Sequence, residues 1–199
     1  MPAASQRVGR RERNKQEKLD RITAAARELF AEHGVDEVTT QQIADKADIG
    51  TGTLFLYAKT KGDLLLLAQN STYADALARG KADAEHTGDT LDAVMAIVRP
   101  VVECNRKHVG NGRTYLREMV FGDPEEPHRR SALALAFETE AAITAVLQRE
   151  LQAEPGAATL AHIVSAIMYL AMAAPNNTDR TVDELLQEIR EQVRTLLPN

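Results

Sequence analysis

Hydrophobic residues recur at helical spacing along almost the whole chain. Between residues 15 and 32 they fall three or four positions apart, which is the spacing of one face of an α-helix. These positions are Leu19, Ile22, Ala26, Leu29 and Phe30. No region alternates like a β-strand for more than a few residues, and the abundance of Ala, Leu, Glu and Arg favours helix. The pattern predicts an all-α fold of about nine helices.

Turn and capping residues set the ends of the predicted helices. Gly34 can adopt the left-handed conformation that ends the first helix. Thr60 with Asp63, and Thr181 with Glu184, match the capping-box pattern at the start of two later helices. The predicted helices cover residues 15–32, 40–47, 51–57, 61–85, 90 to a turn at 111–112, 113–121, 128–154, 157–174 and 182–197. In the seventh, the residues expected to face inward are Leu133, Phe137, Ala141, Thr144, Leu147 and Leu151.

Two of these helices are short and are separated by a tight turn. The turn is Asp48-Ile49-Gly50, because Asp and Gly tolerate the backbone angles of a sharp reversal. Small residues at Ala44, Ala47 and Gly52 allow the two helices to cross closely at a steep angle. This is the geometry of a helix-turn-helix, whose second helix can enter the major groove of DNA.

The order of residues in this stretch is more specific than its geometry. Thr-Gly-Thr-Leu-Phe-Leu-Tyr at 51–57, followed by Lys-Thr-Lys-Gly-Asp-Leu at 59–64, closely resembles the DNA-binding signature of TetR-family transcriptional regulators. The family commonly has Ser, Tyr and Phe at the positions of Gly50, Phe55 and Ala58. The resemblance implies a helix-turn-helix DNA-binding domain with a basic N-terminal arm over residues 1–62. It implies a larger helical ligand-binding and dimerisation domain over residues 63–199.

The candidates for contact with DNA all lie in the first domain or at its border. Thr51 and Thr53 can touch base edges or thymine methyl groups, whereas lysines suit phosphates. The resemblance places a phosphate-binding lysine at Lys61, and Tyr57 is either a phosphate contact or a core residue. The full set is Thr40, Gln41, Gln42, Thr51, Gly52, Thr53, Phe55, Tyr57, Lys59 and Lys61.

Charge is distributed unevenly along the chain. The net charge is −5, yet residues 1–63 hold 11 basic and 10 acidic residues and the remainder holds 13 and 19. An acidic body with a basic tip suits a protein that presents one end to DNA. Residues 1–14 are either a disordered leader or an arm that orders on DNA. The arginines of that arm are Arg7, Arg10, Arg11 and Arg13.

The resemblance also implies a ligand pocket and a dimer in the larger domain. The effector is expected to be an unknown small apolar or amphipathic molecule, because few charges turn inward. The candidate pocket residues, which could equally be ordinary core, are Cys104, His108, Tyr115, Met119, Phe121, Phe137, Met168 and Met172. The family forms homodimers through its two C-terminal helices. A dimer fits a palindromic operator, because one recognition helix reads too few base pairs alone.

Enzymatic, metal-binding and membrane-spanning classes are not expected. The five histidines are far apart, and no pair has ligand spacing on one helix. No nucleophile elbow or phosphate-cradling glycine loop occurs, so no cofactor is expected. The single Cys104 fits a reducing compartment. The longest apolar stretch, residues 163–174, is expected to be too short to cross a bilayer, which favours a cytoplasmic protein.

Together with these patterns, the resemblance implies a homodimeric repressor that a ligand releases from double-stranded operator DNA. An activator of the same fold remains open on sequence alone. So does an all-helical small-molecule binding protein without specific DNA binding.

Overall fold

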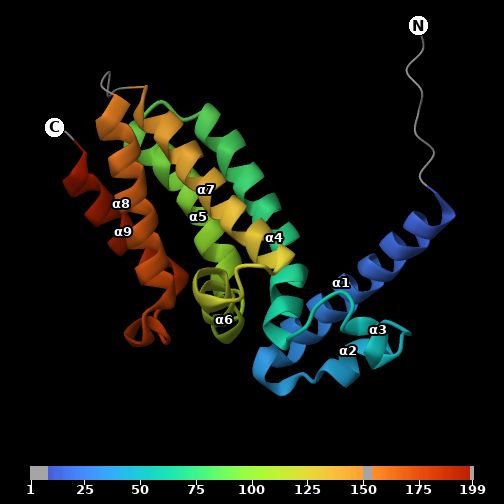
Figure 1. Ribbon diagram of the computed structural model, residues 1–199. Helices are drawn as coiled ribbons and strands as arrows, with labels where there is room; N and C mark the ends of the chain where they lie inside the picture. Colours follow the sequence, from blue (N-terminus) through green and yellow to red (C-terminus); the bar gives the residue numbers. More distant parts are fainter. Residues whose placement is uncertain (1–8, 150–153, 198–199) are drawn as a thin grey trace, which may run out of the picture.

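The computed structural model describes residues 9–149 and 154–197. Over these residues the chain contains nine α-helices, a short 3₁₀ helix and no strand, which confirms the all-α prediction. Figure 1 shows α1, α2 and α3 as a small lobe at one end of a larger body made by α4 to α9. The helices are α1 (Arg10–Glu37), α2 (Thr40–Lys46), α3 (Thr51–Leu54), α4 (Lys61–Glu85), α5 (Thr90–Arg106), α6 (Val109–Phe121), α7 (Pro127–Leu147), α8 (Glu154–Ala173), η1 (Pro175–Asn177) and α9 (Val182–Leu196).

The small lobe is built on the apolar stripe of α1. Ile22, Ala26 and Phe30 are buried there, together with Ile43 of α2 and Leu54 of α3. The helix begins at Arg10 rather than near residue 15, and it is interrupted at Gly34, where φ is +80°. A positive φ favours glycine, and the Cβ of any other residue here would lie 2.8 Å from the His108 ring.

Capping boxes begin three of the helices, two of them as predicted. Thr60 accepts the Asp63 N–H at the start of α4, and Thr181 accepts the Glu184 N–H at the start of α9. In each box the carboxylate accepts the N–H of the threonine in return. A third box at Thr39 begins α2. These local pairs fix where the helices start, because they satisfy N–H groups that have no partner within the helix.

Three features of the helices differ from the sequence prediction. α3 ends at Leu54 instead of near residue 57, because the chain tightens there into turns in which Leu56 N–H donates to Thr53 O. Asn111 does not form a turn but lies in the first turn of α6, which His108 caps by accepting its N–H. α7 is rotated from the predicted phase, so Phe137 is 68% exposed.

The buried face of α7 shows where the predicted phase was wrong. The residues that turn inward are Ala132, Thr139, Ile143, Val146 and Leu147, and of these only Leu147 was predicted to do so. Ala141 is exposed like Phe137, and Thr144 and Leu133 are half-buried. Alanines dominate this helix, so several faces are similarly apolar and the stripe defines its phase weakly. Leu151, which was also expected to face inward, lies outside the described residues.

α4 joins the two parts of the molecule. Its N-terminal half packs against α1 and α6, and it packs along α5 and α7 as well. At Gly80 a Cβ would lie 2.8 Å from the carbonyl oxygen of Ala96, so α4 and α5 are in close backbone contact. The division of the chain at residues 62 and 63 stays a prediction, since α4 begins beside that point and belongs to both packing units.

α8 is long and apolar enough to cross a membrane by length and composition alone. Its apolar part, Gly156–Ala173, is 18 residues long, and 33% of these residues are buried. The expectation that this apolar stretch is too short is therefore corrected: alanines before residue 163 extend it. α8 packs against α6, α7 and α9, and an apolar helix of a folded helical body meets the same criteria as a membrane span.

Candidate nucleic-acid interface and effector cavity

The turn between α2 and α3 positions residues 51–57, which comprise α3 and the turns after it and are called the recognition segment from here on. Asp48 has a φ of +52° and makes the sharp reversal, whereas Gly50 has an ordinary φ of −71°. Gly50 precedes α3 without a side-chain cap. Ile49 packs partly buried against the core. The reversal between α2 and α3 is therefore made by Asp48 rather than by the glycine.

A chain of side-chain hydrogen bonds links the outer faces of α2 and α3. The Thr51 hydroxyl donates to Gln41 Oε1 at 2.6 Å, and Gln41 Nε2 donates to Asp45 Oδ1 at 2.7 Å. Gly52 is exposed, and a Cβ placed on it would meet nothing within 4 Å. Thr51, Gln41 and Gly52 therefore lie together on one open face, where a groove of DNA could approach the backbone of α3.

The other predicted DNA contacts have more varied surroundings. Gln42 is engaged in the capping box of α2. Lys61 Nζ donates to the carbonyl oxygen of Asp36 at 3.0 Å. Tyr57 is partly buried against the core, and its hydroxyl lies 3.5 Å from the Lys15 carbonyl oxygen. Thr40 and Thr53 are half-buried, while Phe55 and Lys59 are exposed.

A basic hollow lies between the start of α1 and α3. It measures about 730 Å³ and brings basic side chains of α1 beside the recognition segment. We call this site the basic hollow. It is lined by Arg11, Glu12, Asn14, Lys15, Lys18, Thr53, Leu56 and Tyr57. Part of the predicted basic arm is thus helical: Arg10, Arg11 and Arg13 lie on α1, and Arg7 lies outside the described residues.

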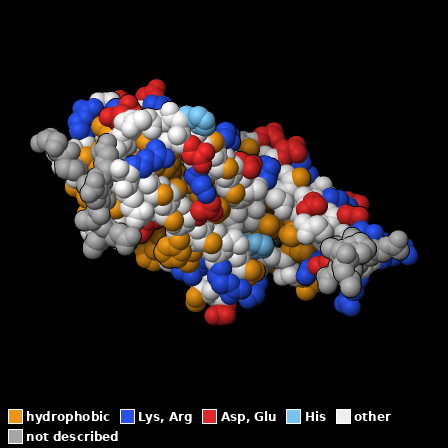
Figure 2. All heavy atoms as spheres, turned by 90° about the horizontal axis from the view of Figure 1, so that it is seen from above, with side chains coloured by type: hydrophobic (Ala, Val, Ile, Leu, Met, Phe, Trp, Pro, Cys, Tyr) orange, Lys and Arg blue, Asp and Glu red, His pale blue; other side chains and the backbone are white. Residues whose placement is uncertain are grey.

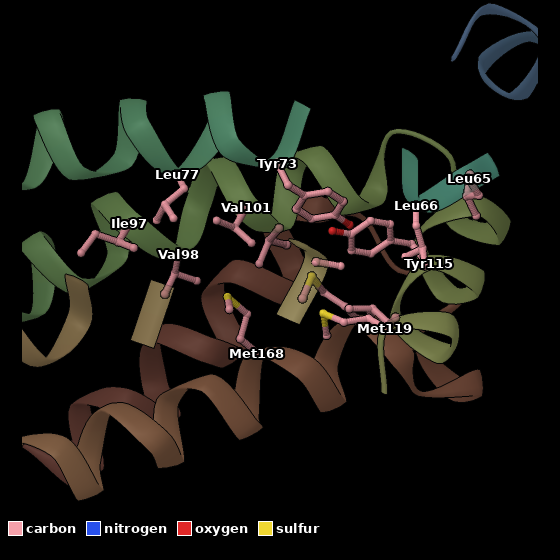
Figure 3. Packing of buried hydrophobic residues seen from close by; sticks show 14 of the residues in the cluster. Leu65, Leu66, Tyr73, Leu77, Ile97, Val98, Val101, Tyr115, Met119 and Met168 are labelled. Atoms are coloured by element: carbon pink, nitrogen blue, oxygen red, sulfur yellow. The ribbon is translucent and has the colours of Figure 1, made fainter. Parts of the chain in front are cut away.

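An apolar cavity lies within the larger body, between α4, α5, α6, α7 and α8. Its volume is about 90 Å³. Figure 3 shows Tyr73 and Tyr115 side by side, with Met119 and Met168 beneath them. The two rings stack with centroids 4.3 Å apart. The lining residues are Tyr73, Val101, Tyr115, Leu116, Met119, Ala132, Leu135, Ala136, Thr139, Ser165, Met168, Tyr169 and Met172.

The cavity brings together half of the residues predicted to touch a ligand. Tyr115, Met119, Met168 and Met172 line it. The other four do not. Cys104 packs partly buried against the core and His108 caps α6 over Gly34. Phe121 and Phe137 are exposed, at 77% and 68%.

Several lining residues were missed by sequence reasoning, notably Tyr73, Thr139 and Ser165. They lie on three different helices, far apart along the chain. Each resembles an ordinary core or capping residue in its local sequence.

One series of hydrogen bonds connects the cavity wall to the end of the recognition segment. The Tyr115 hydroxyl donates to Asn70 Oδ1 at 2.8 Å, and Asn70 Nδ2 donates to the His128 carbonyl oxygen at 2.9 Å. The His128 ring nitrogen Nε2 lies 3.0 Å from the Tyr57 carbonyl oxygen. The cavity and Tyr57, three residues after the end of α3, are therefore joined through α6, α4 and α7.

A second series leads from the same tyrosine pair to α1. Asn105 Nδ2 donates to the Tyr73 hydroxyl at 2.7 Å and to the Gly112 carbonyl oxygen at 3.1 Å. The neighbouring Asn111 accepts the Val35 N–H and donates to the Phe30 carbonyl oxygen, each at 2.7 Å. α6 therefore fastens the end of α1 to the cavity wall.

Burial further disfavours the ionised forms of two tyrosines in the cavity wall and of one thiol nearby. Desolvation raises the pKa of the Tyr73 and Tyr115 hydroxyls well above their ordinary range. Desolvation also raises the pKa of the neighbouring Cys104 thiol to about 11. Among the described residues no group of three or more His, Cys, Asp and Glu could hold a metal ion.

The comparisons with known proteins agree with this geometry. Residues 22–68 match the family described as bacterial regulatory proteins, tetR family. That match covers α2, α3, most of α1 and the start of α4. The helix-turn-helix segment of this chain is therefore that of the tetR family. No curated protein sequence matches it.

Solved structures resemble the chain over nearly all of its length. A putative transcriptional regulator from Rhodococcus sp. RHA1 has a TM-score of 0.67 at 18% identity, covering 89% of this chain and 95% of its own. The regulator FadR from Bacillus subtilis, in complex with stearoyl-CoA, has a TM-score of 0.65 at 15% identity, covering 90% and 99%. PfmR from Thermus thermophilus has a TM-score of 0.62 at 19% identity, covering 90% and 100%. The fold is thus that of DNA-binding transcriptional regulators.

Proposed function

We propose that this protein is a homodimeric TetR-family repressor, which a small apolar molecule releases from a palindromic operator. The observation that carries the proposal is the connection between its two candidate sites. The His128 ring contacts the carbonyl oxygen of Tyr57 beside the recognition helix, and the His128 backbone belongs to the series that begins in the cavity wall. A ligand that repositions Tyr115 can thereby act on the DNA-reading lobe.

The open face of α2 and α3 would read the bases, while the basic hollow would hold the backbone. Gln41 and Thr51 already share a hydrogen bond on that face, so both can turn toward base edges together. Lys15 and Lys18 line the basic hollow and suit phosphates. Lys61 is bonded to one carbonyl oxygen, and its ammonium group has further donors for a phosphate.

We assign the dimer interface to α8, with α7 beside it. The sequence predicted the two C-terminal helices, but the apolar seam of α9 is buried within the chain. α8 instead exposes Leu170 at 65% and Ile163 at 36%. His162 Nδ1 lies 3.1 Å from Glu140 Oε2, which joins the exposed faces of α8 and α7. Figure 2 shows hydrophobic side chains among the charged ones on the surface of the body.

Ligand release would follow from unequal affinity for two arrangements of α4, α6 and α7. A ligand shifts such an equilibrium only by binding one arrangement more tightly than the other. Stearoyl-CoA, the ligand of the Bacillus subtilis regulator, has an acyl chain far larger than a cavity of about 90 Å³. An acyl-CoA would therefore require this cavity to open substantially.

Fluorescence anisotropy on DNA from upstream of the protein's own gene tests the proposal. We expect binding that depends on an inverted repeat and weakens steeply with salt, since phosphate contacts release counterions. A scrambled duplex of the same composition is the control. Weak binding that is equal on both duplexes, and on DNA selected from random genomic fragments, would favour the alternative of a small-molecule binding protein. A reporter gene under the selected operator separates a repressor from an activator.

A further inference from the structure

We propose that the cavity takes a compact, uncharged molecule whose single hydrogen-bonding group meets the Ser165 hydroxyl. This inference rests on the proposed function, in that it names the class of effector for the same cavity. Three independent properties of the lining lead to it: its size, its lack of charge and one buried hydroxyl without a partner.

Size limits the ligand to about one ring or a short branched chain. The cavity measures about 90 Å³. Pockets for drug-sized molecules run from about 300 to 1,000 Å³, and an engineered apolar cavity of about 150 Å³ in another protein binds benzene. Met119, Met168 and Met172 line the cavity here. Methionine side chains are flexible and polarizable, so they can make room for a ring without movement of the helices.

The lining excludes a charged ligand. The described residues that line the cavity include no Asp, Glu, Lys, Arg or His. Tyr73 and Tyr115 in the lining and Cys104 beside it add no negative charge, since their ordinary pKa values lie above neutral pH and burial raises the pKa of each further. A carboxylate or ammonium group would lose its hydration and find no counter-charge, which is prohibitively costly. The ligand is therefore neutral when it is bound.

Ser165 supplies the polar contact. Its Oγ atom is buried and has no hydrogen-bond partner within the described residues. The other buried hydroxyls of the lining are already engaged. Thr139 donates to the Leu135 carbonyl oxygen, Tyr115 donates to Asn70, and Tyr73 accepts from Asn105. A buried hydroxyl without a partner carries a desolvation cost, and a ligand hydroxyl, carbonyl or ether group would remove it.

Three ring compounds of similar size separate these properties. Phenol is neutral with one hydroxyl, toluene lacks the hydroxyl, and benzoate carries a charge at pH 7. Calorimetry on the full chain without DNA should give an affinity for phenol about tenfold above that for toluene, corresponding to one net hydrogen bond. Benzoate should show no binding at millimolar concentration. 4-Phenylphenol, which keeps the hydroxyl but adds a second ring, should also fail to bind.

Variants locate the hydrogen bond. Ser165→Ala should retain toluene binding and lose the preference for phenol. Ser131→Ala is the matched control, because Ser131 is exposed on α7 and its hydroxyl donates to the Pro127 carbonyl oxygen. Equal affinity for phenol and toluene in the parent protein would overturn the role of Ser165. Binding of benzoate as tight as that of phenol, or binding of none of the compounds, would overturn the ligand class.

The outcome is separable from that of the proposed function, because binding is measured without DNA. If the protein prefers phenol through Ser165 but binds no operator, the ligand class proposed here is supported and the repressor function is rejected. If the protein binds its operator but none of these compounds, the DNA-binding function is supported and the ligand class proposed here is rejected.

Discussion

His128 Nε2 lies 3.0 Å from the carbonyl oxygen of Tyr57, so the first turn of α7 is bonded to the segment that follows the recognition helix. A carbonyl oxygen only accepts, so Nε2 carries the ring proton. The backbone of the same histidine accepts from Asn70, which in turn accepts from Tyr115 in the cavity wall. His128 thus contacts the small lobe through its ring and joins the hydrogen-bond network of the cavity wall through its backbone.

Removal of this ring should loosen the end of the recognition segment. In His128→Ala, the amides of residues 55–60 should exchange with deuterium about tenfold faster, in line with the loss of one net hydrogen bond. His162→Ala is the control, since His162 is an exposed histidine whose partner is Glu140. Hydrogen exchange with mass spectrometry measures both. Unchanged protection of residues 55–60 in His128→Ala would show that the contact does not hold that segment.

Substitutions on the two sides of the DNA-binding lobe should have different signatures. Lys15→Ala should weaken binding about equally on all sequences and reduce the slope of log K against log salt by about 0.9. Gln41→Ala should alter base preference by about 1–3 kcal/mol at one position and leave that slope unchanged. Lys81→Ala is the control, because Lys81 pairs with Glu138 on the larger body. It should change neither the salt slope nor the base preference. Anisotropy titrations on operator variants distinguish these outcomes.

Two glycines of α6 should respond in opposite directions to alanine. A Cβ on Gly112 would lie 2.2 Å from the Asn105 carbonyl oxygen, so Gly112→Ala should reduce the free energy of unfolding by about 1–3 kcal/mol. At Gly110 the nearest atom to a Cβ is 3.5 Å away in the His108 ring. Gly110→Ala should therefore be neutral or add up to about 1 kcal/mol through helix propensity. Urea denaturation measures both, and equal effects would contradict the close approach at Gly112.

The Cys104 thiol should react slowly and influence stability only at high pH. Its pKa is raised by burial from 9.0 to about 11, and the thiolate is the reactive form. Alkylation by iodoacetamide should therefore follow an apparent pKa near this value in the folded protein. Because the folded state favours the protonated thiol, its stabilising contribution is complete below pH 9 and is lost as the pH rises toward 11. Cys104→Ala should lack that part of the pH dependence.

A charge on the exposed face of α8 should separate the subunits. Leu170 is 65% exposed in the single chain, and Leu170→Glu would bury a carboxylate in the proposed interface. We expect sedimentation velocity at micromolar concentration to show a dimer for the parent and a monomer for this variant. Gln187→Glu, on the exposed face of α9, should remain dimeric. A dimeric Leu170→Glu and a monomeric Gln187→Glu would instead show that the interface lies on α9.

The parts of the structure that local sequence determines were predictable. The capping boxes at Thr60 and Thr181 involve residues three positions apart, and the turn at Asp48 follows from side-chain chemistry within a few residues. The cavity could not be predicted in this way, because Tyr73, Thr139 and Ser165 meet only after three helices have packed. Asn111 and Gly112 resemble a turn in sequence, yet each is determined by a distant partner. Asn111 forms hydrogen bonds with two backbone groups of α1. Gly112 has no side chain, which leaves room for the Asn105 carbonyl oxygen.

The bonds from Asn111 to α1 bear on how interchangeable the parts of such regulators are. Its amide pairs with the Val35 N–H and the Phe30 carbonyl oxygen, although Asn111 itself belongs to the body. A chimaera joined near residue 62 would transfer the small lobe of α1, α2 and α3 without the Asn111 amide. The Val35 N–H and the Phe30 carbonyl oxygen would then be buried without this partner. A stable chimaera would need an equivalent asparagine in the larger body to which the lobe is joined. Otherwise the first turn of α6 would have to be transferred together with the small lobe. The natural unit of exchange in this protein is therefore discontinuous in sequence.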